Sequence, residues 1–103
     1  NGVRSFSVTH RTAGTQTVTA TDTVTSSITG AQTGITINPA AASTLVVTGF
    51  PDPTTAGVAQ TVTVTARDQY GNTATGYTGT VRITSNDGQA GLPANATLTN
   101  GVR

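Results

Sequence analysis

The chain has 103 residues, of which 34% are hydrophobic and only 9% are charged, and its formal net charge is +1. Its five arginines are scattered, which argues against the basic stripe that binds successive phosphates of a nucleic acid. No apolar run approaches the roughly 20 residues that a membrane-spanning helix needs. The lack of cysteine excludes disulfide bonds and thiolate metal sites, and the lack of lysine excludes lysine-to-asparagine isopeptide links.

Threonine dominates the composition with 25 copies, whereas glutamate, lysine, methionine and tryptophan are absent. A β-branched side chain favours strands over helices. Two phenylalanines and two tyrosines supply little bulk for a core. The composition therefore predicts an all-β chain with a thin core, which gains stability from neighbours on either side.

Seven segments show the two-residue period of a half-buried strand, clearly or in a weaker form. None shows the 3.6-residue apolar period of a helix. In chain order, the predicted strands are 3–9 with Phe6 and Val8 inward, 16–22 with Val18 and Ala20 inward, 33–38, 44–48, 60–68 with Val62, Val64 and Ala66 inward, 80–85 with Val81 and Ile83 inward, and 96–99.

The tetrapeptide Asn-Gly-Val-Arg occurs twice, at 1–4 and again at 100–103, a spacing of 99 residues. That spacing is close to the length of one immunoglobulin-type sandwich and indicates one period of a tandem array. Asn-Gly is also favoured in two-residue hairpins, because both positions tolerate a positive φ. We predict such a turn at Asn100-Gly101, and by repetition at Asn1-Gly2, leading from the Leu98 strand into the Phe6 strand.

Several segments resemble bacterial immunoglobulin-like repeats of the invasin and intimin type. The similar segments are Phe50-Pro51, Thr-Thr-Ala-Gly at 54–57, 61–72 with its Asp-Gln-Tyr-Gly-Asn turn, 79–85, 92–95, 6–9, and 12–22 with its Ala-Gly-Thr-Gln turn. The resemblance covers nearly the whole chain. It implies an antiparallel β-sandwich of about seven strands in a large secreted or cell-surface protein. It implies no catalytic residues and no cofactor.

The usual strand order of that family implies a permuted repeat frame. Residues 1–38 then hold the last three strands of one module, 39–43 form a linker, and 44–103 hold the first strands of the next module. A linker of about five residues reaches at most about 17 Å, whereas a strand is about 30 Å long, so closing one part onto the other would strain the chain. We expect 1–38 to pack with a preceding copy and 43–103 with a following copy, through one long polypeptide or through strand exchange between subunits.

Acidic residues and the single histidine are the first candidates for chemistry. The aspartates are Asp22, Asp52, Asp68 and Asp87. They could contribute to calcium sites at module ends, but each is isolated in the sequence, which is more typical of turn caps. His10 has neither a second histidine nor a cysteine with which to bind a metal or transfer protons. We therefore expect no metal site and no catalytic site.

Two further motifs concern the surface. Asn95 begins the sequence Asn-Ala-Thr, which matches the N-glycosylation acceptor pattern, although a three-residue match is common by chance. Tyr70 and Tyr77 could form a small aromatic binding spot, as on carbohydrate-binding sandwiches. Packing over the end of the sandwich is the simpler role for both rings.

Together these patterns favour a structural role outside the cell. We expect a stalk, spacer or filament of tandem modules, with neighbouring copies of the same repeat as partners, end to end and through lateral edge pairing. Enzymatic activity, nucleic-acid binding and a membrane span are not expected. The alternative is an adhesin-type module that recognises a glycan or a host protein through its loops, for which a clustered aromatic or acidic surface at one end would be the sign.

Overall fold

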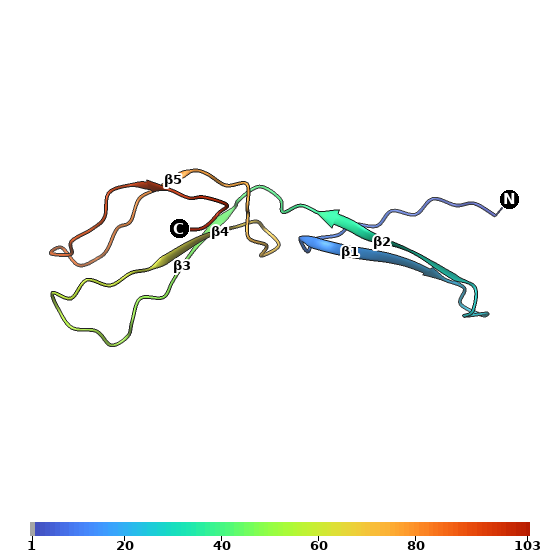
Figure 1. The fold of residues 1–103 in the computed structure, drawn as a ribbon, viewed down its shortest axis with the longest axis horizontal. Helices are drawn as coiled ribbons and strands as arrows, with labels where there is room; N and C mark the ends of the chain where they lie inside the picture. Colours follow the sequence, from blue (N-terminus) through green and yellow to red (C-terminus); the bar gives the residue numbers. More distant parts are fainter. Residues whose placement is uncertain (1) are drawn as a thin grey trace. The chain divides into compact units, whose positions relative to one another are not determined.

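The computed structural model describes residues 2–103, so Asn1 of the predicted Asn1-Gly2 turn lies outside the described residues. The chain separates into two compact units, Asn1–Asn38 (unit 1) and Pro39–Arg103 (unit 2). All regular elements within residues 2–103 are strands, and none is a helix (Figure 1). The chain is therefore all-β and built from small antiparallel sheets, and the composition predicts this class correctly.

Unit 1 contains one hairpin, in which β1 (Gly14–Thr21) pairs antiparallel with β2 (Thr29–Ile37). The register shifts between Gln16 and Val18, and Gly34 in the facing strand has a φ of 69°. A residue without Cβ adopts this left-handed conformation at little cost, which explains the glycine at the bulge. Asp22 caps the turn that follows β1, and the backbone N–H groups of Thr25 and Val24 lower the pKa of its carboxyl.

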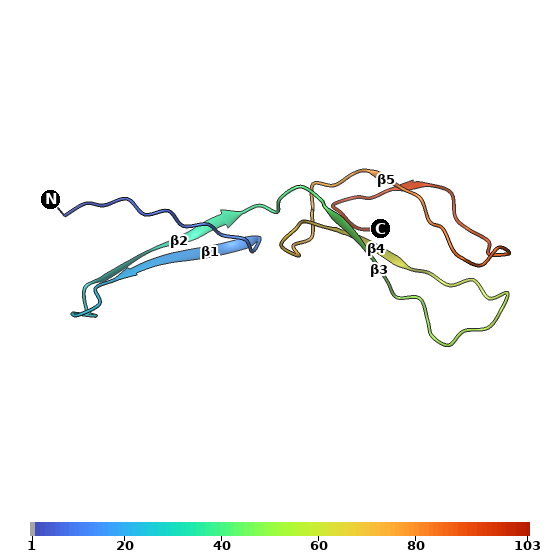
Figure 2. The same ribbon diagram turned by 180° about the vertical axis from the view of Figure 1, so that it is seen from behind.

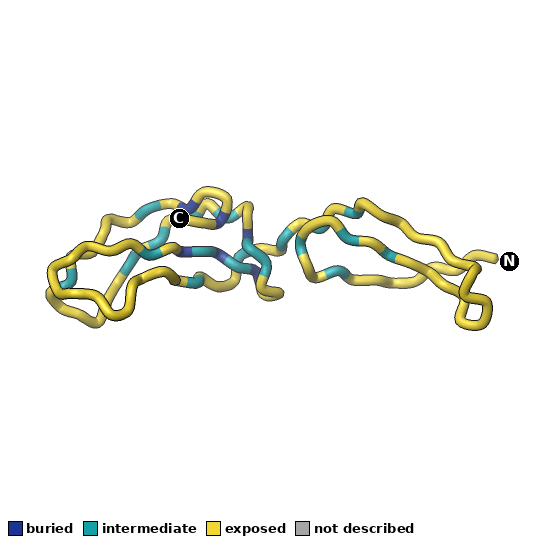
Figure 3. The backbone as a smooth tube through the Cα atoms, turned by 60° about the horizontal axis from the view of Figure 1, so that its bottom comes forward, coloured by how far each residue is buried: buried dark blue, intermediate teal, exposed yellow. Residues whose placement is uncertain are grey.

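None of residues 2–38 is buried (Figure 3). Phe6 is 79% exposed and Val8 is 60% exposed. The sequence predicts a strand at 3–9, but residues 2–10 form no strand in the structure. A strand persists only where a partner satisfies its backbone groups, and the described part of the chain offers this segment no such partner. The prediction that Val18 and Ala20 point inward is only partly right, because Val18 is half-buried and Ala20 is exposed.

Unit 2 begins with β3 (Thr44–Thr48), which pairs antiparallel with β4 (Thr63–Arg67). β5 (Thr80–Val81) and β6 (Ala96–Thr97) form a second, shorter pair. These two strands are shorter than the predicted segments 80–85 and 96–99. The chain between them contains Gly88, Gly91 and Pro93, and such residues weaken or interrupt a ladder of backbone hydrogen bonds.

Among residues 2–103, the buried core lies in unit 2 and is small. Val64, Ala66, Ala74 and Leu98 are buried. Four half-buried residues pack against them, namely Ala42, Tyr77, Val81 and Ile83. The predicted inward face of the 60–68 strand is confirmed, because Val64 and Ala66 are buried and Val62 is half-buried.

Candidate functional site

Most of the polar residues singled out in the sequence are exposed. Asp52, Asp87 and Asn95 are exposed, and Asp87 only caps its own turn by accepting a 2.9 Å hydrogen bond from the Gln89 N–H. Residues 2–103 contain no group of three or more histidine, cysteine, aspartate or glutamate side chains placed to hold a metal ion. No helix within that range is long and apolar enough to cross a membrane. Glycosylation of Asn95 stays a prediction.

His10 and the two tyrosines lie in different local environments. The Nε2 atom of His10 is buried and has no hydrogen-bond partner among the described residues. Tyr70 is 47% exposed in the turn after β4. Tyr77 is half-buried and packs against the core. The structure thus gives the two rings different environments, one open to solvent and one in the core wall.

Asp68 is the polar residue that the structure places in a distinctive environment. It follows β4 directly and is only 3% exposed. Its Oδ1 accepts the backbone N–H groups of Tyr70 and Asn72, each at 2.9 Å. Its Oδ2 accepts the Ala40 N–H and the Asn72 side-chain amide, also at 2.9 Å. The Asp68 carboxylate therefore links its own turn to Ala40, at the start of unit 2.

The pKa of Asp68 reflects this arrangement. Burial of the carboxyl opposes ionisation, but hydrogen bonds from the Asn72 side chain and from the backbone of Ala40, Asn72 and Tyr70 outweigh it. They lower the pKa from an ordinary value of 3.8 to about 2. A carboxyl with a lowered folded-state pKa stabilises the fold above its unfolded-state pKa, and this contribution is lost as the pH falls through the folded-state value.

We expect unit 2 to lose stability progressively as the pH falls from 3.8 towards about 2, the window set by Asp68. The urea midpoint, followed by tyrosine fluorescence, measures this, since both tyrosines lie in unit 2 and the chain has no tryptophan. Asp68→Asn should flatten the profile in that window. It should also lower the midpoint at pH 7, because an amide supplies one acceptor oxygen and turns its NH₂ towards the donors of Ala40 and Asn72.

Asp87→Asn is the matched control for this change. Asp87 is exposed, and its carboxylate accepts a single hydrogen bond, which an amide oxygen can accept equally well. The control should keep both the pH profile and the midpoint of the unsubstituted chain. Equal effects of the two substitutions would contradict the role assigned to Asp68.

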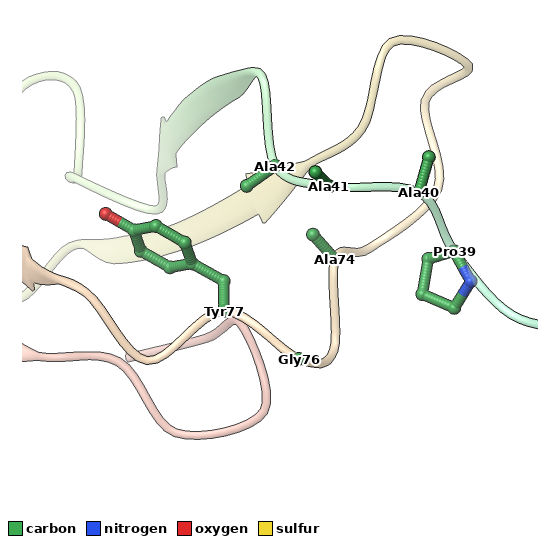
Figure 4. Close-up of a pocket in the computed structure, with 7 residues that line it drawn as sticks. All are labelled: Pro39, Ala40, Ala41, Ala42, Ala74, Gly76 and Tyr77. Carbon is green, nitrogen blue, oxygen red and sulfur yellow. The ribbon is translucent and has the colours of Figure 1, made fainter.

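Residues 39–42, the first residues of unit 2, pack on the rest of that unit. Residues 39–42 line an open hollow of about 360 Å³ with Ala74, Gly76 and Tyr77 (Figure 4). Gly79 leaves room for the Tyr77 ring, because a Cβ at that position would meet the ring atoms. The Ser43 N–H also donates to the Arg67 carbonyl at 2.8 Å. The predicted linker 39–43 is therefore anchored to the rest of unit 2 by Asp68, Arg67 and the core.

The second copy of the tetrapeptide, at 100–103, forms a tight turn in unit 2. Asn100 and Gly101 have φ values of 53° and 77°. Thr99 and Val102 exchange two backbone hydrogen bonds of 3.2 Å across them. The two-residue hairpin predicted from Asn-Gly is thus confirmed at this copy of the tetrapeptide.

The hairpin returns the chain to the side of β4 that faces away from β3. Val64 donates to the Arg103 carbonyl at 2.7 Å and accepts from the Arg103 N–H at 2.9 Å. The Ala66 N–H donates to the Gly101 carbonyl at 2.7 Å. Figure 2 shows the end of the chain beside β4. β4 therefore has backbone partners on both sides over Val64 to Ala66, β3 on one side and the 101–103 segment on the other.

The sequence predicts the turn at the tetrapeptide but not the pairing of Gly101–Arg103 with β4. The pairing joins residues about forty positions apart, and no local pattern encodes it. The alternation of β4 gives the one indirect signal, because a strand with a buried face needs neighbours for its backbone. Comparison of the chain with protein-family models, with curated proteins and with solved structures finds no match.

Proposed function

We propose that this chain is a structural repeat module of an extracellular stalk, spacer or filament. Each module is an immunoglobulin-like sandwich of about seven strands, completed by strands from neighbouring copies of the repeat. The observation that carries this proposal is the uneven distribution of the core. Residues 2–38 contain a paired hairpin but no buried residue, whereas unit 2 contains the whole core.

The energetics of a lone hairpin support the proposal. A two-stranded hairpin is marginally stable in water unless another layer covers one of its faces. Unit 1 leaves Phe6, Val8, Val24 and Ile28 between 60% and 91% exposed. A second copy of the repeat is the partner suggested by the sequence, because Asn-Gly-Val-Arg recurs at the spacing of one module.

The mass of the intact polypeptide in native material tests the proposal. We expect a mass many times 10.3 kDa, as a covalent array requires, measured by denaturing gel and mass spectrometry. A mass near 10.3 kDa together with large assemblies in sedimentation would identify separate subunits that exchange strands. A 10.3 kDa chain that stays monomeric at high concentration would overturn the structural role.

A further inference from the structure

β4 pairs along one edge with the second copy of the tetrapeptide, and the chain before β4 extends this edge beyond Val64, the last paired residue. Val64 is the last position of β4 with a partner there, and Val62 is the next residue whose N–H and C=O point to the same side. Val62 is half-buried and continues the inward face of Val64 and Ala66. Among the described residues, no backbone group pairs with Val62.

The first copy of the tetrapeptide shows which segment would come next. Arg103 lies opposite Val64, and Arg103 corresponds to Arg4 in the repeat. The residues after Arg4 are Ser-Phe-Ser-Val-Thr, which alternate polar and apolar side chains. In their own unit they form no strand.

We infer that Ser5–Thr9 of the following copy continues this strand along β4, with Phe6 directly opposite Val62. In an antiparallel pair, residue numbers rise along one strand as they fall along the other. The observed pairs are Ala66 with Gly101 and Val64 with Arg103, so Val62 pairs with the second residue after Arg103, which is Phe6 of the following copy. In this register, Ser5 lies opposite Thr63 and Val8 lies opposite Gln60. The inference rests on the proposed function, because it requires a second copy of the repeat.

Side-chain placement agrees with this register. Directly opposite residues of an antiparallel pair project to the same face, so Phe6 would join Val62 and Val64 on the inward face of β4. The Arg4 guanidinium lies 5.9 Å from the centroid of the Phe6 ring, so the two side chains project to the same side of their segment. Arg103, the counterpart of Arg4, donates through Nη1 to the Thr97 carbonyl at 3.2 Å.

A two-copy polypeptide, in which Ser5 of the second copy follows Arg103 of the first, allows a direct test. The natural chain has no cysteine, so two introduced cysteines can form only one disulfide within the polypeptide. Val62→Cys in the first copy and Phe6→Cys in the second would occupy a hydrogen-bonded pair, about 5.5 Å apart between Cα atoms and within disulfide range. We expect this pair to oxidise at least about tenfold faster than the register control, Val62→Cys with Val8→Cys, which lies on a diagonal of about 7–8 Å.

Equal oxidation rates for the two pairs, or faster oxidation of the control, would overturn the inference. The proposed function would stand in that case, because the mass of the native polypeptide tests it separately. Amide exchange in the unsubstituted two-copy chain gives an independent measurement in case a cysteine disturbs the fold. We expect one Val62 N–H to exchange at least about tenfold slower than the other, which lacks a following Ser5–Thr9; two equally fast amides would contradict the pairing.

Discussion

Leu98→Ala is expected to lower the free energy of unfolding of unit 2 by about 3 kcal/mol, within the range for truncating a buried leucine. Leu98 is 2% exposed and is the largest aliphatic side chain in a core otherwise made of Val64, Ala66 and Ala74. Small neighbours cannot move far enough to fill the space that the substitution leaves. A core of this size rarely contributes more than about 3–5 kcal/mol to stability, so the free energy of unfolding of the variant should be close to zero.

Urea denaturation followed by tyrosine fluorescence measures this effect in the full chain, since Tyr70 and Tyr77 both belong to unit 2. Leu92→Ala is the matched control, because the same atoms are removed from a side chain that is 48% exposed. The control should change the free energy of unfolding by no more than about 0.5 kcal/mol. Similar losses at both positions would show that Leu98 is not the centre of the core.

Gly101→Ala is expected to cost about 2–4 kcal/mol, because two separate effects add at this position. The residue has a φ of 77°, which L-amino acids with a Cβ rarely adopt. A Cβ there would also run into the Ala74 carbonyl oxygen. Gly101 is buried against Ala74, and its carbonyl accepts a hydrogen bond from the Ala66 N–H, so the turn cannot move away from Ala74 without disturbing that pairing.

Two other glycines separate these contributions. Gly71 has a φ of 85° but open space around its Cβ position, so Gly71→Ala should cost about 1–2 kcal/mol for the backbone conformation alone. Gly91 has neither a positive φ nor a close neighbour, and Gly91→Ala should leave the urea midpoint unchanged or slightly raised. A loss at Gly101 no larger than that at Gly71 would contradict the close approach to Ala74.

Local patterns predicted the strands that have partners in the chain. The 44–48 segment matches β3, and the 60–68 and 16–22 segments contain β4 and most of β1. The 3–9 segment has the same alternation but forms no strand. Periodicity measures the ability of a segment to form a strand, whereas a strand also needs a neighbouring backbone, and that neighbour is set by tertiary structure.

The polar residues show the same limit. The spacing of Asp68, Tyr70 and Asn72 suggests a capped turn, because an aspartate readily accepts the N–H two residues on. Nothing local connects Asp68 with Ala40, which lies 28 residues away in the sequence. The Ala40 N–H donates one of the four hydrogen bonds that lower the pKa of Asp68. The sequence alone therefore gives no reason to separate Asp68 from the three exposed aspartates.

The uneven distribution of the core has a consequence for the order in which such a chain matures during synthesis. Residues 2–38 leave the ribosome first, yet none of them is buried when the chain is considered alone. Unit 2 can close only after Leu98 and the Asn100-Gly101 hairpin have emerged. In a polypeptide of many copies, residues 2–38 of each new copy would thus pack on the core of the copy made just before it. Folding during synthesis would then proceed across the boundaries between repeats.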